Sequence, residues 1–195
     1  MLVFQVLEYS SNGDWLSLKQ RVLAVLDVHS AVYKQLHAAN TMYSVGTCGH
    51  VELAALLLDA GMPVDKATAD GFTLLHGAAE AGQVELVHIL LDRGANIEVR
   101  TKLGSTPLLY ASTSNKLEVV KQLLRRGADV NVRDHEGWTS LHWAAHKGHL
   151  PVVQSLVRAG ANTVAHVFGK FAIDMAKQSE HTAVVDFLSL HPHEP

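Results

Sequence analysis

The sequence lacks the features of a secreted or membrane-spanning protein. Cys48 is the single cysteine, which rules out an internal disulfide, and no Asn-x-Ser/Thr sequon occurs. Both absences favour a reducing compartment, so we expect a cytoplasmic location, with the nucleus also open. Residues 1–7 are apolar but carry no basic leader, which argues against a secretory signal. No stretch approaches the roughly 18 uninterrupted apolar residues of a membrane span.

Charge is also scarce. Charged residues make up 18% of the 195 residues, and the formal net charge is −3. Nucleic acids and anionic membrane surfaces are bound by a concentrated basic face, which this balance does not indicate. We therefore expect a protein partner, no nucleic acid and no membrane, and a monomeric chain.

The sequence does contain a repeat. Gly61, Gly94, Gly127 and Gly160 follow one another at intervals of 33 residues, each after a run rich in leucine or valine. A unit of this size cannot bury its own apolar face, so neighbouring units must stack into a rod with one continuous core. The repeat therefore predicts an elongated, all-α protein with a long surface and no catalytic centre.

The first half of each repeat predicts a helix. The tetrads 73–76, 106–109 and 139–142 begin with threonine, whose side chain can cap the first turn of a helix. Pro107 suits the first helical position, where its missing N–H costs nothing. Small residues, mostly alanine, follow each tetrad and would let neighbouring helices approach closely.

A turn and a second helix complete the repeat. Gly49, Gly82 and Gly148 mark the turn, and Asn115 takes the equivalent position in the remaining copy. Glycine and asparagine are the residues that reach left-handed backbone angles at low cost, so this exchange supports the alignment. Valine and leucine then recur at helical spacing up to the repeat glycines, which we expect to be left-handed caps.

The full pattern of Gly-x-Thr-Pro-Leu-His-x-Ala-Ala, a later Gly-His and a closing Gly-Ala resembles the ankyrin repeat. The resemblance covers most of the chain and is closest in residues 71–76 with 94–96, and in 137–142 with 160–162. It implies an ankyrin-repeat α-solenoid, in which helix-turn-helix units are joined by β-hairpin fingers. It also implies that the chain is not an enzyme.

The ends of the chain depart from the pattern. Gly13 lies 36 residues before Gly49, which indicates an insertion near residues 27–33. Gly169 follows Gly160 by 9 residues where earlier intervals are 10, so the last finger should be one residue short. The expected units of this single solenoid domain are a degenerate N-terminal capping repeat with the insertion at 1–36, a degenerate repeat at 37–69, ankyrin repeats at 70–102, 103–135 and 136–167, a C-terminal capping repeat at 168–190, and a tail at 191–195.

The sequence gives less support to a catalytic or metal-binding site than to structural roles for the same residues. His142, His146 and His149 have a spacing that zinc ligands can use, but His142 and His149 occupy positions with structural roles in the resembled family. Neither a Gly-x-Ser-x-Gly elbow nor a phosphate-binding Gly-x-x-x-x-Gly-Lys occurs. We therefore expect no catalytic residues, no metal and no cofactor.

The resemblance places partner contacts at the finger tips and on the exposed side of each first helix, which together line the concave face. Phe72 and Trp138 carry most weight, because large rings that packing does not require are typical of binding hot spots. The alternative is that each ring packs against the adjacent finger. The expected partner-binding residues are Asp70, Phe72, Glu80, Ala81, Lys102, Leu103, Ser105, Thr113, Ser114, His135, Glu136, Trp138, His146, Lys147, Phe168 and Lys170.

Two surface features have ordinary explanations. Lys121, Arg125 and Arg126 form a small basic cluster on the convex side, which we interpret as a solvated face. Asn131 resembles the asparagine that ankyrin domains present to an asparaginyl hydroxylase, although it also suits a turn.

The resemblance supports two functions. The first is a non-enzymatic module that binds a partner protein through the concave face. The alternative is a regulator that blocks an enzyme, as small ankyrin inhibitors of cyclin-dependent kinases do. The degenerate repeat with Met42 and Tyr43 would distinguish them, because those inhibitors also use an irregular early repeat.

Overall fold

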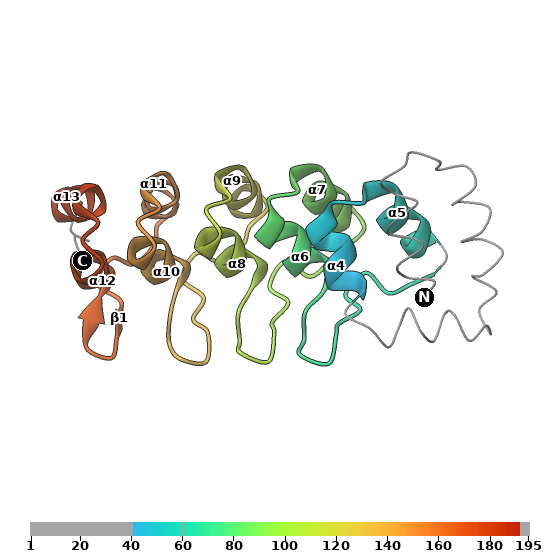
Figure 1. Cartoon of the computed structure of the whole chain (residues 1–195), viewed down its shortest axis with the longest axis horizontal. Helices are drawn as coiled ribbons and strands as arrows, with labels where there is room; N and C mark the ends of the chain where they lie inside the picture. Colours follow the sequence, from blue (N-terminus) through green and yellow to red (C-terminus); the bar gives the residue numbers. More distant parts are fainter. Residues whose placement is uncertain (1–40, 60, 192–195) are drawn as a thin grey trace.

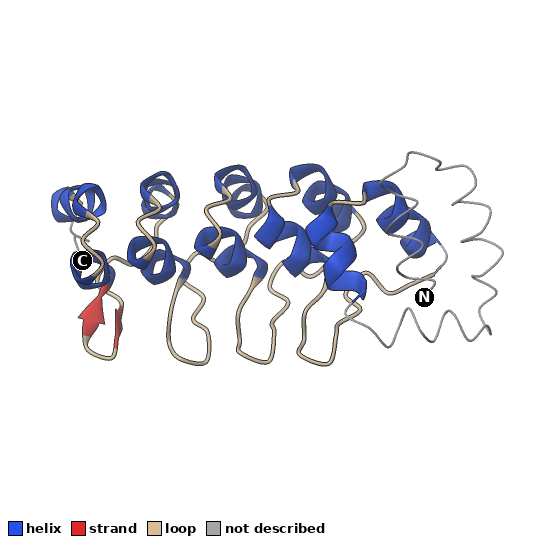
Figure 2. Ribbon diagram, in the orientation of Figure 1, coloured by secondary structure: helices blue, strands red, loops and turns tan. Residues whose placement is uncertain are grey.

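The computed structural model describes residues 41–59 and 61–191 as a row of helix pairs (Figures 1 and 2). The expected N-terminal capping repeat, with its insertion, and residues 192–195 of the tail lie outside the described residues. The helices are α4 (Thr41–Cys48), α5 (Val51–Asp59), α6 (Leu74–Ala81), α7 (Val84–Asp92), α8 (Pro107–Thr113), α9 (Leu117–Arg125), α10 (Ser140–His146), α11 (Leu150–Arg158), α12 (Ala172–Gln178) and α13 (Thr182–Leu190), and the strands are β1 (His166–Val167) and β2 (Lys170–Phe171).

The helices form two layers along the rod. Figure 1 shows the first helices α6, α8, α10 and α12 in the lower layer, next to the fingers, and the second helices α7, α9, α11 and α13 above them. Each first helix contacts the next first helix, and the second helices α7, α9, α11 and α13 contact one another in turn. The prediction of an elongated all-α solenoid, held together by contacts between sequence neighbours, is confirmed.

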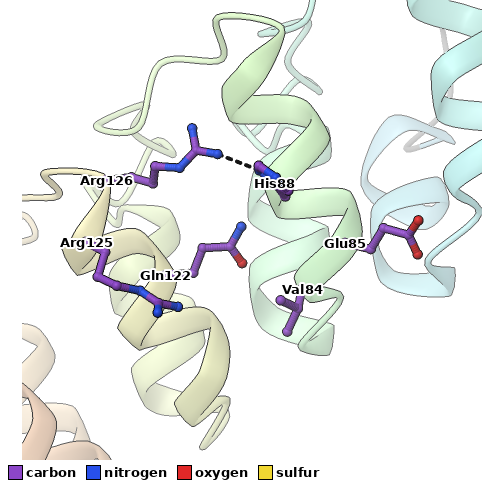
Figure 3. Close-up of a pocket in the computed structure, with 6 residues that line it drawn as sticks. All are labelled: Val84, Glu85, His88, Gln122, Arg125 and Arg126. Carbon is purple, nitrogen blue, oxygen red and sulfur yellow. Dashed lines mark hydrogen bonds between the residues drawn. The ribbon is translucent and has the colours of Figure 1, made fainter.

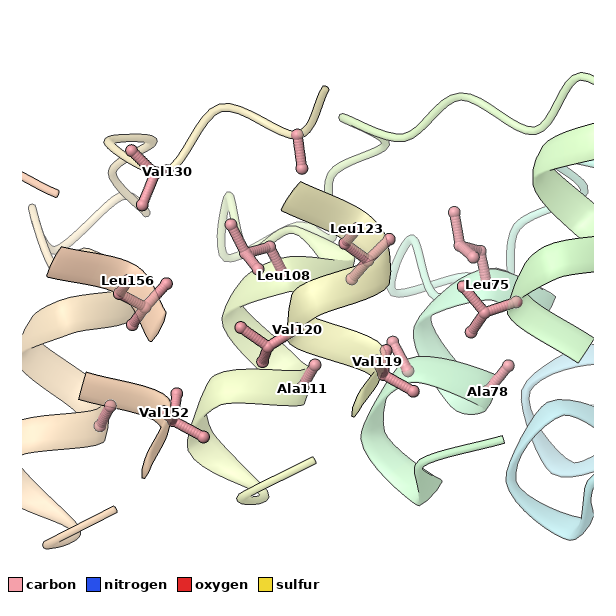
Figure 4. Packing of buried hydrophobic residues seen from close by; sticks show 14 of the residues in the cluster. Leu75, Ala78, Leu108, Ala111, Val119, Val120, Leu123, Val130, Val152 and Leu156 are labelled. Atoms are coloured by element: carbon pink, nitrogen blue, oxygen red, sulfur yellow. The ribbon is translucent and has the colours of Figure 1, made fainter. Parts of the chain in front are cut away.

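The core is continuous between units (Figure 4). Leucines such as Leu75, Leu108 and Leu123 are at most 2% exposed, and Ala78 and Ala111 are fully buried where one first helix approaches the next. A fully buried leucine contributes about 1.5–3 kcal/mol relative to an exposed one. The short side chains matter as much as the long ones, because a larger group at the alanine positions would push adjacent units apart.

The degenerate repeat joins the row through glycine. A Cβ atom on Gly46 would lie 2.5 Å from the Leu74 carbonyl oxygen, and one on Gly77 would lie 2.4 Å from the Tyr43 carbonyl oxygen. Side chains at either position would therefore collide with the backbone of the facing helix. α4 packs against α6 at a distance that only glycine allows.

The threonine tetrads cap their helices as expected. The side-chain oxygens of Thr73, Thr106 and Thr139 each accept a 3.4 Å hydrogen bond from the backbone N–H three residues later. In two of the tetrads the last residue is a buried histidine that bonds to the next finger. His76 Nε2 donates to the Ser105 carbonyl at 3.1 Å, and His142 Nε2 donates to the Ala165 carbonyl at 3.0 Å.

The turns between paired helices also have the conformation that the sequence predicts. Asn115 has a φ of 57°, in the left-handed region where Gly82 and Gly148 lie, so the predicted equivalence is confirmed. The repeat glycines at 61, 94, 127 and 160 have φ between 84° and 90°. A Cβ there would meet nothing within 4 Å, so backbone conformation alone requires glycine.

The fingers turn back on themselves as expected, but most of those described contain no paired strands. Among the described residues, only the last finger contains strands, β1 and β2, paired antiparallel. The fingers at 68–72, 101–105 and 134–138 are three-residue loops in which a turn is followed by a left-handed glycine. The last finger is one residue shorter, and both residues of its turn, Phe168 and Gly169, have positive φ. Such a two-residue turn matches the twist of paired strands, which explains why strands form there.

The tetrad histidines make stability depend on pH. Burial lowers the pKa of His76 to about 4, and it also lowers the pKa of His142. In the unfolded chain both rings have pKa values near 6.5, so below that pH the unfolded state binds protons that the folded state does not. Stability therefore falls as the pH falls through 6.5, and for His76 the loss is complete below about pH 4. We expect the preferential protonation of His76 in the unfolded state to lower the free energy of unfolding by about 1 kcal/mol at pH 5.5 and by about 3 kcal/mol at pH 4.

Urea unfolding at pH 7.5 and 5.5 measures this effect. Leu109 occupies the same tetrad position in the intervening unit, so the variant His76→Leu/His142→Leu is a matched control. It should be less stable than the parent at pH 7.5 by about 1–3 kcal/mol, because buried carbonyls lose their donors. Its stability should change less between the two pH values. An equal pH dependence of parent and variant would show that other groups are responsible.

Candidate functional site

The face formed by the fingers and the first helices, which the resemblance to ankyrin repeats implies is concave, contains a groove. It lies between the fingers at 101–105 and 134–138 and the helices α8 and α10, and has a volume of about 310 Å³. The fingers are joined in register, because the Lys102 N–H donates to the Asp70 carbonyl and the His135 N–H donates to the Leu103 carbonyl, each at 2.9 Å. The groove is lined by Leu103, Ser105, Leu109, Tyr110, Thr113, Asp134, His135, Glu136 and Trp143.

Asp134 organises the wall of this groove. Its Oδ1 accepts hydrogen bonds from the backbone N–H groups of Glu136, at 3.0 Å, and Trp138, at 2.8 Å. Its Oδ2 accepts a longer bond of 3.4 Å from the indole N–H of Trp143. The carboxylate therefore fixes both the finger and an aromatic ring of α10.

Aromatic rings line the concave side of the first helices. The Trp138 and Trp143 ring centroids lie 4.4 Å apart, and those of Phe72 and Tyr110 lie 5.5 Å apart. Burial raises the pKa of Tyr110, and the negative charges of Glu80 and Asp134 add to this effect. Since these rings come from successive units, the aromatic surface exists only in the stacked rod.

Phe72 and Trp138 are not free at the finger tips, which corrects the expectation. Phe72 is half-buried between Tyr43, at 4.9 Å between ring centroids, and Tyr110. Trp138 packs against Trp143, and its indole N–H is buried with no hydrogen-bond partner. Both rings pack on helices, because the short fingers turn back onto the first helices and bring residue 72 or 138 against them.

Ser105 is a second correction. It was expected on the partner-binding surface, but it is 5% exposed, and its carbonyl accepts the hydrogen bond from His76. The residue just after the left-handed glycine of each finger points back toward the helices. Ser105 therefore serves the contact between units, and it lines the groove with little exposed surface.

Of the remaining predicted residues, Leu103, Thr113, His135 and Glu136 line the groove, and the others lie elsewhere on the fingers and first helices. Asp70 and Lys102 form an ion pair of 3.8 Å between neighbouring finger tips, while Leu103 is 65% and Phe168 79% exposed. Glu80 accepts a hydrogen bond from the Tyr43 hydroxyl. Ala81, Thr113, Ser114, His146 and Lys147 lie at the ends of first helices, His135 and Glu136 at a finger tip, and Lys170 on β2, bonded to Gln178.

Sequence reasoning missed three important lining residues, Tyr110, Asp134 and Trp143. Tyr110 and Trp143 share one position of the repeat, which Gly77 fills in the preceding good copy. A position that changes from glycine to tyrosine to tryptophan is not fixed by the repeat, and this variation was the available signal. Asp134 gave no comparable signal, because aspartate is common in turns.

The convex side carries a second groove, between α7 and α9, with a volume of about 680 Å³ (Figure 3). One of its two arginines is engaged by neighbouring side chains. Arg126 donates to Asp92 at 2.7 Å and contacts His88, and Lys121 outside the groove pairs with Glu118 at 2.8 Å. These pairs agree with the interpretation of a solvated, charge-balanced face.

The histidines proposed as zinc ligands have other contacts. His142 bonds to the next finger, and His149 Nε2 donates to the Thr113 carbonyl at 3.0 Å. His146 Nδ1 lies 3.0 Å from the Ser179 hydroxyl. In the described part of the chain, no group of three or more potential ligands could hold a metal ion. No helix within residues 41–59 and 61–191 is long and apolar enough to cross a membrane.

A family model described as ankyrin repeats (3 copies) matches residues 31–101 and 108–194, well over half of the sequence. The chain belongs to the ankyrin repeat family. No curated protein matches it. Ankyrin repeats are generally modules of protein–protein interaction, and the family is generally non-enzymatic. Family membership therefore confirms the predicted resemblance and indicates a protein partner without identifying it.

The corrected positions of the large rings lead to a stability prediction. Phe72→Ala should lower the free energy of unfolding of this ankyrin domain by about 2–3 kcal/mol, because a half-buried ring leaves a gap between units. Trp138→Phe should change it by less than about 1 kcal/mol, because the loss of ring area is offset by removal of an unpaired N–H. Urea unfolding measures both. An unchanged stability for Phe72→Ala would restore the view that this ring is free of packing.

Proposed function

We propose that the chain is a monomeric, non-enzymatic module that binds a partner protein through its concave face. The central contact is the groove between the fingers at 101–105 and 134–138. The observation that carries the proposal is the convergence of exposed Leu103, His135 and Glu136 with the half-buried rings of Tyr110 and Trp143 in this groove. Aromatic and apolar groups beside polar ones are the usual composition of a protein-binding surface.

The rigidity of the surface supports this function. Main-chain hydrogen bonds join successive fingers, and Asp134 fixes the loop that borders the groove. A surface that is already ordered loses little conformational entropy when a partner binds. We infer an adaptor or scaffold role in the cytoplasm, with no binding of nucleic acid. Inhibition of a kinase remains a prediction, since no contact described above favours it.

Exposed groove residues allow binding to be tested apart from folding. Leu103→Ser/His135→Ser should weaken partner capture by about tenfold, which corresponds to about 1.4 kcal/mol. Its stability should stay within about 0.5 kcal/mol of the parent, because neither side chain is buried. Affinity purification from cells that express the protein, with quantification of each recovered protein by mass spectrometry, identifies partners. Titration of a recovered partner then gives the affinities.

The convex face supplies the control. Glu85→Ser/Lys121→Ser removes two exposed side chains there and should leave capture unchanged. If this variant loses the partner while the concave variant keeps it, the binding face has been assigned to the wrong side of the rod.

A further inference from the structure

We propose that the concave groove receives a lysine or arginine side chain from an extended segment of the partner protein. The inference rests on the proposed function and adds the chemistry of the partner. It follows from the charge, the hydrogen bonding and the aromatic lining of the groove, taken in turn below.

The groove carries negative charge that the protein does not neutralise. Asp134 and Glu136 line it, and none of its lining residues is lysine or arginine. In residues 41–59 and 61–191, no salt bridge joins either carboxylate to a basic side chain. Two basic residues next to lining residues in the sequence have other contacts: Lys102 pairs with Asp70, and Arg133 donates to the carbonyls of Gly137 and His166. A cationic side chain of the partner would neutralise these carboxylates.

The Asp134 carboxylate is held in place before a partner arrives. Two backbone N–H groups hold Oδ1 at 2.8 and 3.0 Å, whereas the contact of Oδ2 with Trp143 is 3.4 Å. Oδ2 therefore retains capacity to accept a shorter, charge-assisted bond, which is about twice as strong as a neutral one. The exposed Glu136 lies two residues away on the same finger and can supply a second acceptor.

The rest of the lining suits the remainder of a basic side chain. Tyr110 and Trp143 offer aromatic rings, which attract cations placed over their faces. Leu103 and Leu109 offer apolar contacts for the methylene stem of lysine or arginine, which packs on such surfaces while its charged end seeks polar groups. An acidic or purely apolar side chain would leave the carboxylates without a cationic partner.

The convex groove shows the opposite character. Arg125 and Arg126 line it, and Glu85 is its only acidic lining residue (Figure 3). A basic segment would meet the Arg125 guanidinium there, while Arg126 is already paired with Asp92. The two grooves therefore discriminate between partners by the sign of charge, which contributes more to specificity than to affinity.

A randomised peptide library displayed on phage, selected on the full chain, tests the inference. Enriched peptides are synthesised, and each lysine or arginine is replaced by norleucine in a matched peptide. Titration calorimetry compares the parent chain with Asp134→Asn/Glu136→Gln. Asparagine keeps an oxygen acceptor for the two backbone N–H groups, so the finger should hold its structure, and circular dichroism with urea unfolding checks this. Glu85→Gln on the convex side is the control.

The expected result is enrichment of peptides with a basic residue. Norleucine replacement and Asp134→Asn/Glu136→Gln should each weaken binding by about tenfold. Glu85→Gln should have no effect, and binding should weaken as salt is raised. Basic peptides that bind the Asp134→Asn/Glu136→Gln chain as tightly as the parent would overturn the inference.

Two outcomes separate this inference from the proposed function. If enriched peptides lack basic residues but lose binding on Leu103→Ser/His135→Ser, the groove is a binding site and the charge inference is wrong. If no enriched peptide depends on any groove residue, both the inference and the assignment of the concave face are wrong.

Discussion

The apolar face of each helix pair can be covered only by the next pair, and the rest of the structure follows from this constraint. Buried leucines of one unit meet buried alanines and valines of its neighbour, so the core has no boundary between units (Figure 4). Hydrophobic burial drives the helix pairs to stack in a row, and hydrogen bonds fix the distance between neighbouring pairs. The tetrad histidines His76 and His142 carry those bonds from one helix pair to the finger that follows.

Stacking also creates the surface on which function depends. Fingers that leave the helices at a fixed interval bring their tips together, as the bonds from Lys102 to Asp70 and from His135 to Leu103 show. The groove then forms where two fingers and two first helices meet, so no single unit contains it. Loss of stacking would therefore abolish the surface.

The large aromatic residues illustrate how one interaction serves both stability and recognition. Trp138 packs behind Trp143, and Trp143 borders the groove while it donates to Asp134. Phe72 has a similar place between Tyr43 and Tyr110. The exposed side chains of the finger tips are less constrained by packing. Binding specificity can therefore change at these positions with little effect on the core.

The sequence by itself determined the architecture, because its signals are local. A capping threonine, a left-handed glycine or asparagine and the helical spacing of leucines act within a few residues, and the interval of 33 residues repeats them in register. The tertiary structure alone decided which side chains remain accessible. The Ser105 carbonyl meets His76 from the preceding unit, Trp138 packs on Trp143 of its own unit, and Asp134 shares the groove with Leu103 and Tyr110 of the preceding unit. These contacts depend on how sharply each finger turns and how closely the units stack, and neither is set by any one segment.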